Sequence, residues 1–157
     1  MLHFAPLHDY ELIRETIANP KIYAHVSDDG SPSREDFIPA DHPAIVYLGA
    51  YEGTEYLGLW MLCPANSICW DVHTCLLPSS WGALATQATK AAIEWVFENT
   101  DCRRLITSVP STNRLALKLA EHSGMTRYGV NPSSFLKNGK LLDQILLGIS
   151  KADQSCQ

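Results

Sequence analysis

The fold is decided by residues 68–85, Ile-Cys-Trp-Asp-Val-His-Thr-Cys-Leu-Leu-Pro-Ser-Ser-Trp-Gly-Ala-Leu-Ala, because this stretch joins a predicted strand to a predicted helix through a tight turn. The first N–H groups of a helix have no acceptor within the helix, so they favour an anion placed against them. Gly82 lets another molecule approach the backbone without a Cβ in the way. The stretch therefore predicts a seat for a phosphate or pyrophosphate. A purely structural turn is the alternative, since such junctions are common.

The size and composition predict one domain. The chain has 157 residues, of which 46% are apolar, enough for a single hydrophobic core. We expect that domain over residues 1–150, followed by a polar C-terminal tail over residues 151–157. The net charge of −5 argues against a nucleic acid partner, which would be a polyanion.

Membrane and metal partners are not expected either. No run approaches the roughly 20 apolar residues that span a bilayer, and the N-terminus lacks the pattern of a secretory signal, so we expect a cytoplasmic protein. The five cysteines form no C-x-x-C pair, and the six histidines form no H-E-x-x-H motif. We therefore predict neither a metal site nor a disulfide framework.

The first third of the chain reads as a strand and two short helices. A strand over residues 2–7 precedes a helix capped by Asp9, which Asn19-Pro20 ends before a second short helix. Residues 27–43 form a polar, net acidic loop with a helical turn at residues 34–37. This loop is either a solvated connector or a functional lid.

The remaining elements define the sheet. Strands over residues 44–51, 56–63 and 68–77 are joined by short turns, so they are antiparallel neighbours. An amphipathic helix over residues 83–99 leads to a strand over residues 104–109, which is therefore parallel to the strand over 68–77. Asn113 is the predicted N-cap of a second helix, and Gly124 suits its C′ position. Strands over residues 127–136 and 140–150 form a hairpin around Asn138-Gly139.

This order of elements resembles the GNAT acetyltransferase superfamily over about residues 2–150. Its most specific local feature is Val109-Pro110-Ser111-Thr112-Asn113, with Asn113 opening a helix that Gly124-Met125 closes, an interval typical of GNAT members. The Trp81-Gly82 pair is also similar to many of them. The resemblance implies an α+β fold (α/β/α-like) in one GNAT-type domain. That fold has a mixed, mostly antiparallel sheet, splayed parallel central strands and flanking helices.

The resemblance also implies a cosubstrate and its site. Acetyl-CoA would lie where the parallel strands splay apart, with its pantetheine arm paired to backbone near Cys75, Leu76 and Leu77 and in contact with Asn113. Its pyrophosphate would rest on the backbone amides of Trp81, Gly82, Ala83, Leu84 and Ala85.

A second resemblance is to a smaller group of phage-encoded GNAT-like proteins, some of which are associated with head assembly. It rests on residues 73–78, on Trp81-Gly82 and on residues 135–139. Such proteins need not be enzymes.

Three positions depart from the superfamily pattern. Ser79 and Leu84 stand where the phosphate loop usually has Gln or Arg and a final Gly or Ala. Ala120 replaces a tyrosine that often serves as general acid. Ser108 stands where some protein-acetylating members carry a glutamate, which makes it a third catalytic candidate after Asp71 and His73.

Catalysis would depend on the strand over residues 68–77. Strand alternation places Asp71, His73 and Cys75 on one face. Transfer to an amine needs a group that removes a proton, and we expect Asp71 to do this through water, because a carboxylate pKa of about 4 is too low unless burial raises it. His73 is the second candidate. The alternative is that both are structural residues. Cys75 as a nucleophile is disfavoured, since side chains two apart on a strand lie about 6.5 Å from each other.

The sequence thus predicts an acetyl-CoA-dependent N-acetyltransferase that moves an acetyl group to a primary amine of a small molecule or protein. The alternative is a non-catalytic GNAT-fold module that binds a protein or acyl-CoA, as in phage assembly. Ala120 and the unusual phosphate loop favour this alternative. The acidic loop hints at a cationic amine such as a lysine, a protein N-terminus or a polyamine. The oligomeric state stays open, with a homodimer as one option.

Overall fold

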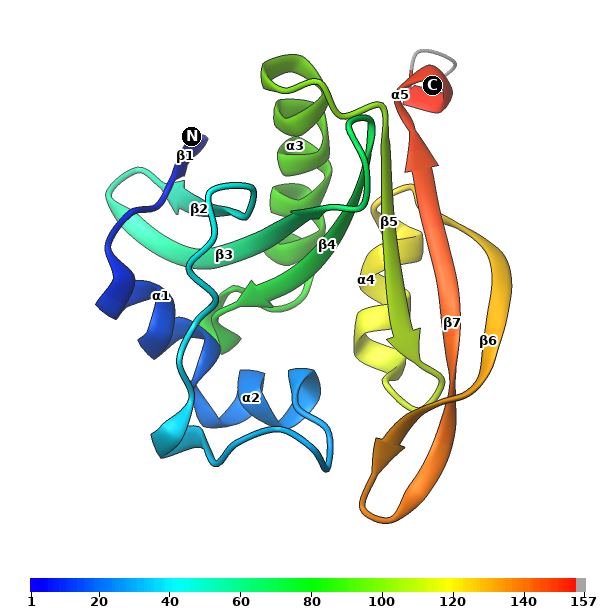
Figure 1. The fold of residues 1–157 in the computed structure, drawn as a ribbon. Helices are drawn as coiled ribbons and strands as arrows, with labels where there is room; N and C mark the ends of the chain where they lie inside the picture. The colour runs from blue at the N-terminus through cyan, green and yellow to red at the C-terminus, as the bar shows by residue number, and fades with distance from the viewer. Residues whose placement is uncertain (155–157) are drawn as a thin grey trace.

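The computed structural model describes residues 1–154, which form one seven-stranded sheet with helices on both faces (Figure 1). The strand order is β1-β2-β3-β4-β5-β7-β6, and every neighbouring pair is antiparallel except β4 and β5. The strands are β1 (Leu2–Pro6), β2 (Val46–Glu52), β3 (Glu55–Pro64), β4 (Cys69–Leu76), β5 (Arg104–Pro110), β6 (Thr126–Lys137) and β7 (Lys140–Ser150). The helices are α1 (Tyr10–Ile17), α2 (Pro20–Val26), α3 (Ala83–Asn99), α4 (Arg114–His122) and α5 (Lys151–Gln154), with short 3₁₀ turns η1 (Arg34–Asp36) and η2 (Pro78–Ser80).

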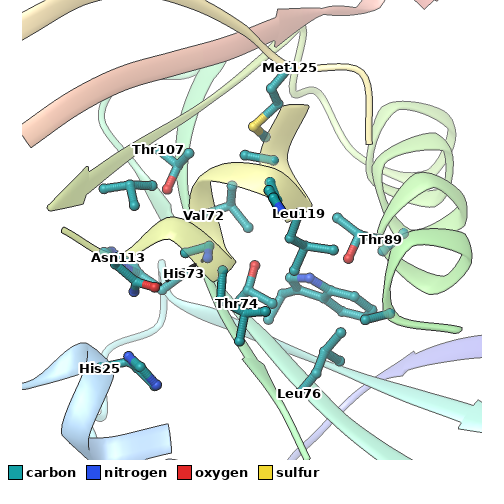
Figure 2. A pocket seen from close by; sticks show the side chains of 18 of the residues that line it. His25, Val72, His73, Thr74, Leu76, Thr89, Thr107, Asn113, Leu119 and Met125 are labelled. Carbon is teal, nitrogen blue, oxygen red and sulfur yellow. Dashed lines mark hydrogen bonds between the residues drawn. The ribbon is translucent and has the colours of Figure 1, made fainter. Parts of the chain in front are cut away.

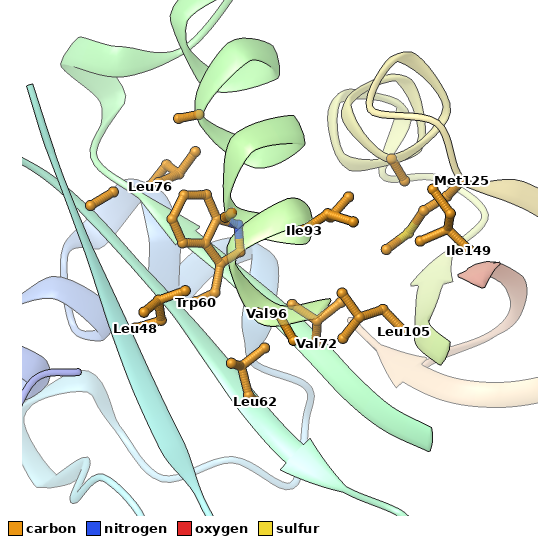
Figure 3. Packing of buried hydrophobic residues seen from close by; sticks show 14 of the residues in the cluster. Leu48, Trp60, Leu62, Val72, Leu76, Ile93, Val96, Leu105, Met125 and Ile149 are labelled. Atoms are coloured by element: carbon orange, nitrogen blue, oxygen red, sulfur yellow. The ribbon is translucent and has the colours of Figure 1, made fainter. Parts of the chain in front are cut away.

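Two hydrophobic clusters cover the two faces of the sheet. On one face, α3 and α4 pack on side chains of β2 to β5, with Trp60, Leu62 and Leu105 fully buried among them (Figure 3). On the other face, α1 and α2 pack on β2, β3 and β4, with Ile13 and Leu59 buried in a smaller cluster. Side chains along β4 alternate between the two clusters, as strand geometry requires.

The parallel pair of β4 and β5 is short. Three residue pairs are in register, ending with Asp71 opposite Ile106, after which the two strands separate (Figure 1). The predicted splayed parallel strands, the antiparallel three-strand segment before them and the predicted α+β fold are confirmed.

The helix caps follow local chemistry. The Asp9 carboxylate accepts from Leu12 N at 3.1 Å, and the Asn113 side chain accepts from Ala116 N at 3.2 Å, so both predicted N-caps are confirmed. Gly124 follows α4 with φ of 104°, a conformation that favours glycine at this position.

The structure refines three local predictions. The tight turn before α3 is the 3₁₀ turn η2, because Pro78 fixes φ and Ser80 N–H donates to Leu77 O. β5 runs through Pro110, which can end a strand although it donates no hydrogen bond. The predicted polar tail starts as the helix α5, and its last residues, 155–157, lie outside the described part of the chain.

Across residues 1–154 no helix combines the length and apolar character needed to cross a membrane.

Candidate active site

A cavity of about 500 Å³ opens where β4 and β5 separate (Figure 2). Its walls come from both strands, from the first turns of α3, from α4 and from α2. Most of the lining is apolar, and its polar side chains include His25, His73, Thr74, Thr107, Asn113 and Lys118. The cavity therefore joins the two faces of the sheet through the gap between the parallel strands.

One end of the cavity meets the N-terminus of α3. Gly82 is the N-cap of this helix with φ of 101°, and a Cβ added there would meet no atom within 4 Å, so the backbone is open to an incoming group. No acidic residue lies in the first turn, and Thr86 N donates to the O of the N-cap residue Gly82 at 3.2 Å. The N–H groups at residues 83–85 thus have no acceptor within the helix and can face an anion.

The Trp81 ring lies at this end of the cavity. Its backbone N–H donates to Pro78 O at 3.2 Å, so it is not available to a phosphate. The indole Nε1 donates to Leu76 O at 2.9 Å, and the ring lies edge-on to His25 with centroids 6.3 Å apart. The hydrogen bond to β4 and the ring contact with α2 therefore position the Trp81 ring at the edge of the cavity.

Successive peptide groups along β4 point alternately toward β3 and toward the gap. Leu77 N–H donates to Leu57 O at 2.8 Å, so its peptide group points toward β3. Because successive peptide groups of a strand point to opposite sides, those of Leu76, Thr74 and Val72 point toward the gap. A linear ligand in the gap could pair with these groups.

The predicted catalytic residues share one face of the sheet. His73 and Ser108 line the cavity, from β4 and β5 respectively, while Asp71 lies behind His73 at the closed end of the gap. His73 Nε2 and Asp71 Oδ2 are 3.9 Å apart, and their side chains are 45% and 36% exposed. Of this pair, only His73 lines the cavity.

The Asp71 carboxyl has an unusual environment. Its Oδ1 is buried and has no hydrogen-bond partner among the described residues. Burial raises the pKa of this carboxyl above its ordinary value, and nearby His73 and the Val72 N–H offset part of that rise. The Asp71 carboxylate can therefore interact favourably with a positive charge on the His73 imidazole.

The other predicted site residues divide into two groups. Leu76, Gly82, Ala83, Ala85, Trp81 and Asn113 line the cavity. Cys75, Leu77 and Leu84 do not line it among the described contacts, because Cys75 and Leu77 pack in the α1 cluster and Leu84 packs against the α3 side of the core. Burial raises the pKa of the Cys75 thiol to about 12, which agrees with its rejection as a nucleophile.

Several cavity residues were missed by the sequence analysis. Lys118 and His122 line the cavity from α4, and their spacing from Arg114 by four and eight residues is a helical signal that could have been noticed. His25 reaches the cavity from α2, and no local pattern indicates this. Ala120 is buried in the cavity wall and offers no hydroxyl group there.

At the open end of the gap, residues 24–29 bind residues 136–139 at the tip of the β6–β7 hairpin (Figure 1). We call this set of contacts the strap. The Asp29 carboxylate accepts from Asn138 N and Gly139 N, both at 2.8 Å, and Asp29 N donates to Leu136 O. Lys137 Nζ donates to Ala24 O at 2.9 Å and to Ser27 O at 2.7 Å. The strap joins segments more than 100 residues apart.

Within residues 1–154, no group of three or more His, Cys, Asp or Glu side chains is arranged to hold a metal ion.

The splayed pair, the amide-bearing helix start after β4 and the capped helix after β5 define the GNAT acetyltransferase fold, and solved structures agree. Spermidine N-acetyltransferase from Vibrio cholerae, solved with CoA and spermine, is 18% identical, with a TM-score of 0.78 and 96% of each chain covered. Ribosomal-protein-S5-alanine acetyltransferase from Vibrio fischeri is 15% identical, with a TM-score of 0.73 and 97% of this chain and 94% of that chain covered. A probable GNAT-family acetyltransferase from Chromobacterium violaceum is 14% identical, with a TM-score of 0.77 and coverage of 98% and 85%.

A sequence match assigns the chain to a protein family. A family model described as "Protein of unknown function (DUF2824)" matches residues 16–155, so the chain belongs to the DUF2824 family. A comparison with curated proteins gives no match.

Proposed function

We propose that the chain is an acetyl-CoA-dependent N-acetyltransferase that moves an acetyl group to a primary amine. The observation that carries this proposal is the early separation of β4 and β5, which opens a cavity running from the amides of α3 to His73 and Ser108. A structural neighbour from Vibrio cholerae was solved with CoA, which supports the choice of cosubstrate.

The residues present fit such a cosubstrate. The open backbone at Gly82 and the free N–H groups at residues 83–85 would hold its pyrophosphate. The peptide group of Thr74 and the N–H of Leu76, which face the gap, would pair with the pantetheine arm beside Asn113, while Leu76 O keeps its bond from Trp81 Nε1. Lys118 on α4 adds a positive charge at the same cavity.

His73 is the proposed general base. An amine that attacks a thioester carbonyl must lose a proton as the N–C bond forms and the C–S bond breaks, and the leaving thiolate must gain one. His73 lines the cavity, and imidazoles ordinarily titrate near neutral pH. Asp71, 3.9 Å behind it, would stabilise the protonated imidazole and act as a positioning residue. Ser108, on the same face, is proposed to relay a proton: its hydroxyl passes one to the leaving thiolate as it takes another from the protonated His73 or from water, so the hydroxyl is restored.

The second candidate is a non-catalytic GNAT-fold module that binds acyl-CoA or a partner protein, as in phage assembly or in a homodimer. Ala120 favours it, because the cavity wall there carries a methyl group and no proton donor. In this case the cavity would bind CoA or stay unused, and no amine would release thiol from acetyl-CoA.

The first test is binding. Acetyl-CoA or CoA at one hundred times its Kd should add about 2.7 kcal/mol to the stability of the fold, which a thermal shift assay detects. Thr86→Glu places a negative charge beside the proposed phosphate seat and should weaken this binding. Gln87→Glu is the matched control, because Gln87 is exposed on the same helix and does not line the cavity. The absence of any shift at millimolar acetyl-CoA and CoA would contradict the proposal.

The second test is turnover. Thiol release from acetyl-CoA should require an added amine, and His73→Gln should abolish it while leaving acetyl-CoA binding intact. Binding without release for any amine tested would favour the non-catalytic module.

A further inference from the structure

A second cavity, of about 310 Å³, lies under the strap. Its walls are α2, the start of α4 and the hairpin of β6 and β7. It shares His25, Pro110, Asn113, Leu115 and Phe135 with the main cavity, so the two spaces adjoin each other. Its volume is at the lower end of the roughly 300–1,000 Å³ that is typical of small-molecule sites.

The charged side chains of this second cavity are cationic. Arg114 lines it from α4, and Lys137 lines it from the hairpin. Among the described residues that line it, none is acidic. Asp29 lies just outside, where it binds the hairpin backbone and faces Lys137, so part of the lysine charge is offset and Arg114 is the freer cation.

Arg114 lies at a helix position where a positive charge is unfavourable. It is the first residue of α4, where the partial positive charge of the helix N-terminus disfavours a cation. No hydrogen bond or ion pair to its side chain occurs among the described residues. Arg114 is exposed at the wall of the second cavity, and an anionic group that enters this cavity could therefore form a charge-assisted pair with it.

Most carboxylates of the acidic loop already have a partner within the protein. Asp28 accepts from Gly30 N and Ser31 Oγ, Asp29 accepts from the hairpin, and Asp36 accepts from Ser33 Oγ. Glu35 pairs with Arg34. Of the five acidic side chains of this loop, only Asp41 has no hydrogen bond or ion pair among the described residues, which weakens the expectation that this loop selects a cationic amine.

The strap limits the size of what can enter. Six hydrogen bonds tie residues 24–29 to residues 136–139 above the second cavity. A molecule in this space must fit between α2, the hairpin and α4, with apolar contacts from Leu115, Phe135 and Leu142.

We propose that the second cavity holds the acceptor, and that the acceptor is a small amine with an anionic group, such as a free amino acid or a phosphorylated amine. This proposal rests on the proposed acetyl transfer. The anionic group would pair with Arg114, the body of the molecule would contact the apolar walls, and the amine would extend into the main cavity toward His73.

The experiment compares matched acceptors by thiol release from acetyl-CoA. Leucine and leucinamide differ in the carboxylate alone, O-phosphoethanolamine carries a phosphate in its place, and spermidine is purely cationic. We expect an anionic amine to have at least a tenfold higher kcat/KM than its uncharged counterpart or spermidine, since a charge-assisted hydrogen bond contributes about one to two factors of ten. Preference for leucine or for O-phosphoethanolamine identifies the anionic group as a carboxylate or a phosphate.

Variants at two arginines locate the effect. Arg114→Gln should raise KM for the anionic amine about 10- to 100-fold, with kcat and the KM for acetyl-CoA little changed. Arg103→Gln, at the opposite end of the sheet, is the matched control and should change neither. Circular dichroism of both variants checks that the fold is retained.

Three results would overturn the inference. These are equal or better use of leucinamide or spermidine, an Arg114→Gln variant that behaves like Arg103→Gln, and no binding of either anionic amine to the CoA-loaded protein by calorimetry. If acetyl-CoA itself does not bind, the proposed function fails first and the inference fails with it. If acetyl-CoA binds and a cationic amine is acetylated, the proposed function stands and the inference alone is wrong.

Discussion

The two ends of the gap between β4 and β5 are held in different ways. At the closed end, backbone pairing and buried apolar side chains join the strands, with Leu105 opposite Trp70. At the open end, the strap joins α2 to the hairpin through exposed polar contacts such as that of Asp29. From this difference we expect the closed end to contribute more to the stability of the fold than the open end, whose polar contacts lie beside the second cavity.

The largest effect is expected at the closed end. Leu105 is 1% exposed, so Leu105→Ala should lower the free energy of unfolding by about 2–5 kcal/mol through lost burial and a residual cavity. Urea unfolding measures this loss. Leu141→Ala, at an exposed position of the hairpin, is the matched control and should change stability by less than about 0.5 kcal/mol. Equal losses in the two variants would contradict the assigned roles of the two ends.

A smaller effect is expected at Asp71, the last paired residue before the gap. Burial raises its pKa in the folded state above the ordinary 3.8, so the folded state binds the proton more tightly than the unfolded state. The favourable contribution of Asp71 is therefore fully present below pH 3.8 and is lost as the pH rises through the raised pKa. His73 and Cys63 are the titratable groups that interact with this carboxyl.

Asp71→Asn removes this titration. The stability of the variant relative to the unaltered protein should therefore increase as the pH rises from 3.8 toward neutrality, and urea unfolding at a series of pH values checks it. The Asp71→Asn variant should also have a lower N-acetyltransferase activity, because Asp71 is proposed to stabilise the protonated His73 imidazole. A stability difference that is independent of pH would mean that the Asp71 carboxyl is not perturbed.

The sequence could predict the closed end and the open backbone at the start of α3, because both depend on local chemistry. Asp9 and Asn113 were recognised as caps, and Gly82 was recognised as an open backbone position, from a few neighbouring residues each. The parallel relation of β4 and β5 followed from the helix that connects them.

The rest depends on contacts between distant segments. Strand alternation places Asp71 and His73 on one face of the sheet and says nothing about where the strands separate. The separation begins after Asp71, so His73 reaches the cavity and Asp71 does not. Similarly, Asp29 was counted as a charge of an acidic loop, because nothing near it in the sequence indicates that it binds Asn138 and Gly139.

The smallest effect on global stability is expected at the open end, from Asp29→Asn. The hydrogen bonds from Gly139 N and Asn138 N lower the pKa of the Asp29 carboxyl, so its contribution is present above pH 3.8 and is lost as the pH falls through the lowered pKa. Because an asparagine keeps one acceptor oxygen and loses the charge, the variant should retain one of the two bonds. The unfolding midpoint should hardly change, while amide hydrogen exchange at Asn138 and Gly139 should become faster.

The control for Asp29→Asn is Asp36→Asn, because Asp36 lies in the same acidic loop and bonds only Ser33 beside it. Faster exchange at the hairpin tip in the Asp29 variant alone would assign the strap to this carboxylate. If both variants exchange alike, the hairpin is held by the Lys137 contacts with Ala24 and Ser27, and charge at residue 29 does not matter. If the unfolding midpoint falls as far as in Leu105→Ala, the open end would carry global stability too, and the contrast between the two ends would be lost.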